Sequence, residues 1–364
     1  MIVGIDASHA NKTKRTGVEE YCFQIIEEFK KIIPSDTKVI LYSNCALISE
    51  LAEIPNNWEM KILHWPFKKM WSQFRLAYEL YKNPPDIYFS PGQLLPLLSP
   101  KNSVVMIHDS AFESQPKAYR FFGRQYLRLM NRIIVKKSKL ILTSTEFNKK
   151  EILNFYDSFL KDKIQVIPLA YDNNKFNSNI KKQENIYGRY ILSIGRLEEK
   201  KNTKRIVEAF NILKKDLPDL KLILIGAAGA GYDEVKQAID TSEYKTDIIL
   251  LGFVLPQDLT SILAQAQVFV FPSLYEGFGI PILEAMAVGV PVIASKGTAL
   301  PEVGGEAAVY ADPLVVKDFA SKIVLLIKDE NLRKQQINLG WQRVKDFSWQ
   351  KTAGQTWQIL KNIK

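Results

Sequence analysis

The stretch "SLYEGFGIPILEAMAVGVPVIAS", residues 273–295, predicts a glycine loop, a helix and a strand in succession. The residues before it, Val268–Phe271, are apolar and β-branched or aromatic, which is typical of a buried strand. Gly277 and Gly279 permit a turn that other residues resist, and Pro281 suits a first helical turn, where its missing N–H costs nothing. The whole segment is therefore a strand, a glycine loop, a helix and a second strand, which is the repeating unit of a parallel α/β sheet.

Two carboxylates flank this glycine turn, with Glu276 in the loop and Glu284 about one turn inside the helix. The N–H groups at the start of the helix, near Gly279 and Ile280, carry partial positive charge and suit a phosphate. A carboxylate beside a phosphate repels it, so both carboxylates suit sugar hydroxyls instead. One ligand with a sugar at each end of a diphosphate satisfies both; the alternative is an ordinary first-turn acid and a solvated loop residue.

A second motif, "SIGRLEEKKN" at residues 193–202, places two cations behind another predicted strand. Arg196 follows Gly195 directly after the strand, and Lys201 stands at the start of the next helix. Arg196 is a bidentate donor and Lys201 a point charge, and both suit a diphosphate. The alternative is a solvated basic loop.

Length and composition limit the classes of protein that remain. The 364 residues suffice for two domains, and 46% hydrophobic with 24% charged residues is typical of a globular protein. No apolar run approaches the roughly 18 residues of a membrane helix, and the N-terminus has no signal-peptide layout. Two cysteines are too few for a disulfide framework and three histidines show no metal-ligand spacing, so we expect a cytoplasmic protein without a metal site.

Strand-like and helix-like segments alternate along the chain, which indicates α/β architecture with parallel sheets. Strands are expected at residues 2–6, 39–42, 87–90, 104–108, 140–144 and 164–168, and, after a polar stretch without apparent structure, at 190–197, 222–226, 248–252, 268–271 and 292–294. The restart predicts two doubly wound, Rossmann-like domains facing across a cleft. We place them at residues 1–172 and 188–345, with a linker at 173–187.

These motifs together resemble glycosyltransferase family 4, whose members are retaining enzymes with two Rossmann-like domains, the GT-B fold. The Glu276-to-Glu284 spacing and "GRLEEKKN" carry the likeness, and further segments follow in family order: "TGVEEY", "VVMIHDSAF", "TSTEFNKKEI", "VIPLAYD", "LPEVGGEAAVYADP" and "FSWQKTAGQTWQIL". The first loop departs from the family, with Thr16-Gly17 where many members have paired glycines, and "VIPLAYD" lacks a glycine after its proline. The likeness implies that residues 346–364 form a helix returning to the first domain.

The resemblance implies a role for each residue that matches a motif. Arg196 and Lys201 neutralise the donor diphosphate as the nucleotide leaves, and Glu284 holds the ribose hydroxyls. Glu276 contacts the transferred sugar, and His108 lines that sugar from the first domain as a positioning residue; its alternative is a capped histidine at a strand end. Arg196, Lys201, Glu276 and His108 form the implied catalytic set. The implied donor-binding set is completed by Gly17, Gly195, Gly277, Phe278, Gly279 and Ile280.

The same resemblance implies the chemistry and its partners. Side chains and a helix end supply the positive charge, so we expect no metal and no cofactor beyond the nucleotide-sugar co-substrate. The N-terminal segments look most like mannosyltransferase-type members, so GDP-mannose is the first expectation for the donor and a UDP-sugar the second. The acceptor is expected to be a glycan or a lipid-linked glycan. Two alternatives stay open: a nucleotide-sugar epimerase of the same fold, and a sugar-nucleotide-binding protein without turnover.

The net charge of +10 is unevenly distributed, because residues 117–139 hold eight basic residues and no acidic one. Five of these are spaced four apart and predict one helical stripe: Arg120, Arg124, Arg128, Arg132 and Lys136. With aromatic residues interleaved, such a helix suits the anionic inner face of a membrane. Nucleic acid is the competing interpretation, but no nucleic-acid-binding motif accompanies the charge, and a plain solvated helix face is the other alternative.

Overall fold

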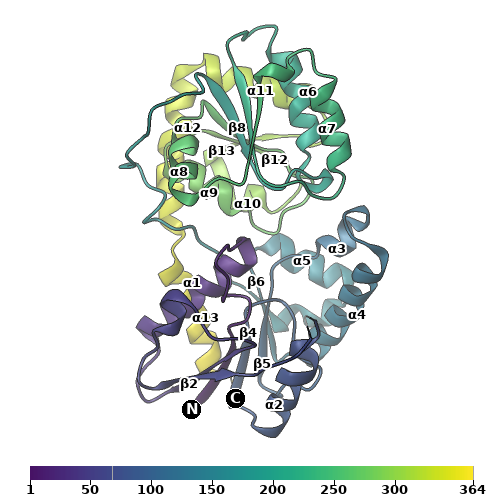
Figure 1. Cartoon of the computed structure of the whole chain (residues 1–364), viewed down its shortest axis with the longest axis vertical. Coiled ribbons are helices and arrows are strands. Elements are labelled where there is room, and N and C mark those ends of the chain that lie inside the picture. The colour runs from purple at the N-terminus through teal and green to yellow at the C-terminus, as the bar shows by residue number, and fades with distance from the viewer. Residues whose placement is uncertain (68, 364) are drawn as a thin grey trace. The chain divides into compact units, whose positions relative to one another are not determined.

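The computed structural model describes residues 1–67 and 69–363 and divides the chain into two compact units (Figure 1). The first unit contains residues 1–113 and 121–169 together with the chain from Trp349 on. The second contains residues 114–120 and 170–348. Each unit is built around one parallel sheet, so the prediction of two Rossmann-like α/β domains is confirmed.

The first unit holds a seven-stranded sheet in the order β3-β2-β1-β4-β5-β6-β7. The strands are β1 (Ile2–Asp6), β2 (Lys38–Ser43), β3 (Trp58–Ile62), β4 (Ile87–Ser90), β5 (Ser103–Ile107), β6 (Leu140–Thr143) and β7 (Ile164–Val166). Most central strands are buried along their whole length, as continuous apolar runs predict for strands covered on both faces. The winding direction reverses between β1 and β4, where doubly wound sheets usually bind ligands.

Helices cover both faces of this sheet. They are α1 (Gly17–Ile32), α2 (Ala77–Lys82), α3 (Ala111–Ser114), α4 (Phe121–Lys137), α5 (Glu146–Phe155) and α13 (Trp349–Lys361), with short helical segments at Ser49–Ala52, Ser72–Leu76 and Ser158–Lys163. Side chains of α2, α4 and α5 join one core cluster with β4, β5 and β6. The helix α13 packs against α1, where the rings of Phe29 and Trp357 lie 6.3 Å apart.

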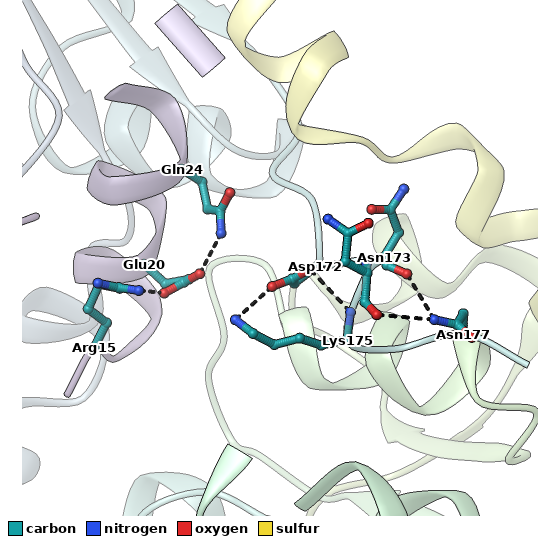
Figure 2. A network of polar contacts seen from close by, with 8 residues as sticks. Arg15, Glu20, Gln24, Asp172, Asn173, Lys175 and Asn177 are labelled. Atoms are coloured by element: carbon teal, nitrogen blue, oxygen red, sulfur yellow. Dashed lines mark hydrogen bonds and ion pairs between the residues drawn. The ribbon is translucent and has the colours of Figure 1, made fainter. Parts of the chain in front are cut away.

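The start of α1 is held by polar contacts of its own side chains. Thr16 and Glu19 form a capping box, in which the Thr16 N–H donates to the Glu19 carboxylate at 2.9 Å. Figure 2 shows Glu20 between Arg15, whose Nε lies 2.9 Å away, and the amide of Gln24 at 2.7 Å. The single glycine of this loop therefore begins a well-capped helix.

The second unit holds a six-stranded parallel sheet in the order β10-β9-β8-β11-β12-β13. Its strands are β8 (Tyr190–Ile194), β9 (Lys221–Ile225), β10 (Ile248–Gly252), β11 (Val268–Phe271), β12 (Val292–Ser295) and β13 (Ala308–Ala311). Its helices are α6 (Thr203–Leu213), α7 (Tyr232–Asp240), α8 (Pro256–Ala264), α9 (Ile280–Ala287), α10 (Leu300–Gly304), α11 (Val316–Lys328) and α12 (Glu330–Arg343). Single turns lie at Pro116–Ala118, Glu199–Lys201, Lys245–Asp247, Gly305–Ala307 and Val344–Asp346. Side chains of α6, α7 and α11 form one core on this sheet, and the winding reverses between β8 and β11.

The connection between β7 and β8, residues 167–189, contains neither helix nor strand. Its first part is nevertheless ordered by hydrogen bonds (Figure 2). The Asp172 carboxylate accepts the N–H groups of Asn174 and Lys175 and pairs with the Lys175 ammonium at 2.7 Å, while the Asn177 amide donates to the Asn174 carbonyl. The stretch expected to lack structure therefore contains no helix or strand, and Asp and Asn side chains fold its first part into turns.

Across the described chain, no helix is both long and apolar enough to cross a bilayer.

Candidate functional site

The two motifs singled out in the sequence lie at the carboxyl ends of the strands of the second sheet, an end that is called the sheet edge below. The loop after β8 carries Arg196 and Lys201, and the loop after β11 carries Glu276 and the glycine turn. Because β8 and β11 are paired in parallel, both loops leave the sheet at the same edge, at the point where the winding reverses. The Leu274 N–H donates to the Lys200 carbonyl at 2.8 Å and joins the two loops directly.

Two glycines allow the loops after β8 and β9 to pack backbone against backbone. Gly195 has φ +153° and Gly226 φ +147°, and the Gly195 N–H donates to the Ile225 carbonyl at 2.9 Å. A Cβ on Gly226 would lie 1.9 Å from the Gly195 carbonyl oxygen, closer than any side chain tolerates. The position of the motif that carries Arg196 therefore depends on Gly226. From the sequence, Gly226 was predicted only to be the last residue of a strand.

Asn202 fixes the position of Lys201, and sequence reasoning gave it no role. It adopts φ +58° just before α6, in the left-handed region that Asn tolerates better than most residues. Its buried amide donates to the carbonyls of Pro272 at 2.9 Å and Pro313 at 2.8 Å. These two hydrogen bonds connect the loops that follow β8, β11 and β13. The only sequence feature that could have indicated this role is an Asn at a predicted helix start.

The glycine turn before α9 is built as the sequence predicted. Gly279 has φ +100°, and a Cβ there would lie 2.4 Å from Leu300 Cδ2. Ile280 is the first residue of α9 and Pro281 lies in its first turn. The Phe278 ring is buried edge-to-face against Phe347, with 5.8 Å between the ring centroids. The Phe278 side chain is therefore part of the packing of the second unit.

Lys201 and Glu276 form an ion pair between the two loops. Both side chains are mostly buried, with 21% and 12% of their surface exposed, and the Lys201 ammonium lies 5.2 Å from the centre of the Phe271 ring. The pair holds a cation and a carboxylate side by side at the sheet edge. Arg196, by contrast, has 68% of its side chain exposed, and its Nε lies 3.8 Å from the Glu198 carboxylate.

A small cavity opens between these loops, and its walls carry both expected cations. The lining includes Gly195, Arg196, Lys201, Phe271 and Ser273. An anion in this cavity would meet a guanidinium and an ammonium. Glu284 lies half-buried on α9, at its fifth residue, so the structure places both carboxylates on the same strand–loop–helix unit.

His108 and Gly17 belong to the first unit. His108 follows β5 directly and is buried, with Nε2 2.8 Å from the Pro91 carbonyl and its ring edge-to-face with Tyr21. Burial lowers the pKa of His108 to about 4, although the Pro91 carbonyl opposes the shift. The imidazole is therefore neutral at pH 7. Gly17 is the first residue of α1 and has open space where a Cβ would stand.

The basic stripe of residues 120–136 differs from its prediction in two respects. Arg120 precedes α4, so only four of the five stripe cations lie on this helix. Arg124 and Arg128 turn toward the carboxylate of Glu113, with Arg128 Nε 2.9 Å from it, because that buried acid needs a partner. Arg132 and Lys136 are exposed.

Apolar side chains occupy the outer face of α4 beside these cations. Phe122 has 85% of its surface exposed and Leu129 58%, and Phe121 and Tyr126 are also exposed. Phe122, Tyr126 and Leu129 stand at i, i+4 and i+7 and so share one stripe of the helix.

Within residues 1–67 and 69–363, no three His, Cys, Asp or Glu side chains gather where they could hold a metal ion.

Comparison with known proteins agrees with this architecture. Residues 172–343 match the family model described as glycosyl transferases group 1. O-antigen chain mannosyltransferase B of Escherichia coli is 28% identical over 98% of this chain and 99% of its own. Sucrose-phosphate synthase from Thermosynechococcus elongatus has the same fold, with a TM-score of 0.76 at 16% identity over 99% of this chain and 98% of that one. Anabaena Alr3699/HepE in complex with UDP and glucose gives a TM-score of 0.74 at 18% identity over 99% of each chain.

The two parallel-sheet units have the GT-B fold that the resemblance predicted. The match of residues 172–343 to the group 1 glycosyltransferase model, together with the similarity to the Escherichia coli mannosyltransferase, supports a glycosyltransferase that uses a nucleotide-sugar donor.

Proposed function

We propose that the chain is a retaining hexosyltransferase that moves mannose from GDP-mannose to a glycan or lipid-linked glycan, with a UDP-sugar as the second candidate donor. The observation that carries this proposal is the meeting of Lys201, Glu276, Arg196 and the start of α9 at one sheet edge. Mannose is favoured by the name of the Escherichia coli relative, which is similar over nearly the whole chain. The complex of Anabaena HepE with UDP and glucose is the reason to keep a UDP-sugar in view.

In this proposal the donor diphosphate binds against Arg196 and Lys201 at the sheet edge, beside the start of α9. These groups offset the charge that grows on the leaving diphosphate when its bond to the sugar C1 breaks. The acceptor oxygen forms the new bond to C1 on the same face, and its proton passes to the departing diphosphate. Side chains and the helix end supply the positive charge, so the reaction needs no metal ion.

Glu276 orients the transferred sugar, and Glu284 holds the ribose hydroxyls. Gly195 and the backbone of Gly277, Phe278 and Ile280 approach the donor closely. His108 acts as a positioning residue, because a buried imidazole with a pKa of about 4 is a poor base at neutral pH and a good neutral hydrogen-bonding group.

The test is incubation of the protein with GDP-mannose or a UDP-sugar, with and without a glycan acceptor, while free nucleoside diphosphate is measured. Release that rises with the acceptor and survives EDTA supports the proposal. An isomerised donor without acceptor identifies an epimerase instead, and tight binding without any product identifies a binding protein.

The acceptor side of the proposal includes the inner face of a membrane. The outer face of α4 carries the stripe of Phe122, Tyr126 and Leu129, and the cations Arg132 and Lys136 stand beside it. Amphipathic helices that combine exposed aromatic residues with cations bind at the interface of anionic bilayers. Since Arg124 and Arg128 already pair with Glu113, the apolar stripe is the larger contribution.

Co-sedimentation with vesicles tests this surface. We expect binding to vesicles that contain phosphatidylglycerol, weaker binding to phosphatidylcholine alone, and loss of binding in the double variant Phe122→Ser, Leu129→Ser. The matched control is Leu325→Ser, which removes a half-exposed leucine from α11 of the second unit. If the double variant sediments as the parent does, α4 is a solvated face and the membrane part of the proposal is wrong.

A further inference from the structure

Two serine hydroxyls at the edge of the second sheet are buried and lack a hydrogen-bond partner among the described residues. Ser273 stands two residues beyond β11 and Ser295 is the last residue of β12, and both are 0% exposed. Buried hydroxyls are nearly always hydrogen-bonded, because a donor without a partner loses its bonds to water and gains nothing in return. Each of the two therefore asks for an explanation.

The surroundings of the two hydroxyls differ. Ser273 lines the small cavity that also holds Arg196 and Lys201. Ser295 is not among the described residues that line this cavity. Ser273 thus lines a cavity whose walls carry two cations, whereas Ser295 does not.

We propose that Ser273 is a donor-binding residue, whose hydroxyl donates a hydrogen bond to a phosphate oxygen of the nucleoside diphosphate. This inference rests on the proposed function, because it names one more contact of the same site. Phosphate oxygens are strong acceptors, and a bound diphosphate supplies the partner that the hydroxyl lacks.

A neutral donor has a specific use at this position. The ion pair with Glu276 already neutralises part of the positive charge of Lys201. A further cation in the cavity would hold the product nucleotide more tightly, whereas a hydroxyl fixes one phosphate oxygen without adding charge. Ser273 also follows the buried strand β11 by only two residues, so its position is set by the sheet rather than by a long loop.

The experiment measures binding of GDP, UDP and inorganic pyrophosphate by calorimetry to the parent, Ser273→Ala and Ser295→Ala. The unfolding temperature of each protein is recorded without ligand. We expect Ser273→Ala to weaken binding of the preferred nucleotide and of pyrophosphate by about tenfold, which corresponds to one charge-assisted hydrogen bond. Without ligand, this variant should unfold at the same temperature as the parent or higher, because an orphaned hydroxyl has been removed.

Ser295→Ala is the matched control, since it removes an equally buried orphaned hydroxyl from the neighbouring strand. It should bind the nucleotide as the parent does. Parental affinity in Ser273→Ala overturns the inference, and so does an equal loss in both variants, which would reflect a general disturbance of the sheet edge. A parent that binds neither nucleotide nor pyrophosphate overturns the proposed function and this inference with it.

Discussion

Glu276→Gln is the substitution whose effects on binding and turnover should have opposite signs. The change keeps the shape of the side chain and removes its charge. In the parent, the carboxylate pairs with Lys201 in a mostly buried position beside the cavity. In the proposed site, the Glu276 carboxylate therefore stands next to the negatively charged nucleoside diphosphate and repels it. The same carboxylate also partly neutralises Lys201, the cation that should bind this diphosphate.

The size of the effect follows from Coulomb's law. Two unit charges about 5 Å apart interact with about 3 kcal/mol at an effective dielectric constant of 20, which suits a partly buried site. Solvent and rearrangement of Lys201 reduce this value, so we expect a gain of about 1.4 kcal/mol, or about tenfold tighter binding of the nucleoside diphosphate. Turnover should fall about a hundredfold, because the amide cannot hold the transferred sugar as the carboxylate does.

Calorimetry with GDP and UDP measures the first effect, and release of nucleoside diphosphate in the presence of acceptor measures the second. The matched control is Glu234→Gln, which neutralises another lysine–glutamate pair of the same unit, Lys204–Glu234, outside this cavity. The control should change neither quantity. If Glu276→Gln binds nucleoside diphosphate as weakly as the parent or more weakly, the argument that the pair stands beside the diphosphate is refuted.

Three further predictions concern single side chains. Glu284→Ala should weaken nucleoside diphosphate binding about ten- to a hundredfold in calorimetry, since a charged hydrogen bond to the ribose is lost, and parental affinity would contradict its assignment. Because the pKa of His108 falls from 6.5 to about 4 on folding, the unfolded chain binds more protons between these values. The free energy of unfolding should therefore rise from pH 4 to 6.5 by up to about 3 kcal/mol, and urea titrations should show a flatter rise in His108→Gln. Gly226→Ala should cost more than about 3 kcal/mol of stability because its Cβ would meet the Gly195 carbonyl, whereas Gly252→Ala, with φ +61° and open space, should cost about 1–2 kcal/mol; equal losses would contradict the backbone packing.

Most strands could be predicted from the sequence because they are continuous apolar runs with clear ends. The bounds of β1, β4, β10 and β11 agree with those expected. The strands β3 and β13 were missed. The strand β3, "WEMKI", is the outermost strand of its sheet and alternates apolar and charged residues. The strand β13, "AVYA", is short and rich in alanine. Neither sequence therefore shows the continuous apolar pattern of a buried strand.

Sequence reasoning could place Arg196, Lys201 and Glu276 at one sheet edge, because each follows a strand of the same parallel sheet. It could not predict that Lys201 and Glu276 pair with each other, since this depends on how two loops 75 positions apart approach. The same holds for the hydrogen bonds of Asn202, which reach partners 70 and 111 positions away.

The stripe of α4 shows the same limit in the first unit. Spacing alone grouped Arg124 and Arg128 with the exposed cations, and only the fold brings Glu113 to them. Periodicity could predict which residues share a face of α4. It could not predict that Glu113, which pairs with two of them, lies on the helix α3.

The anomeric configuration of the product tests the central claim most directly. The protein is incubated with GDP-α-mannose and a glycan acceptor, or with an α-linked UDP-sugar if that donor is the one bound, and the product is examined by NMR through its one-bond C1–H1 coupling. We expect an α-linked product and one nucleoside diphosphate released for each sugar transferred, without added metal. A β-linked product, or transfer that stops when EDTA is added, would contradict it.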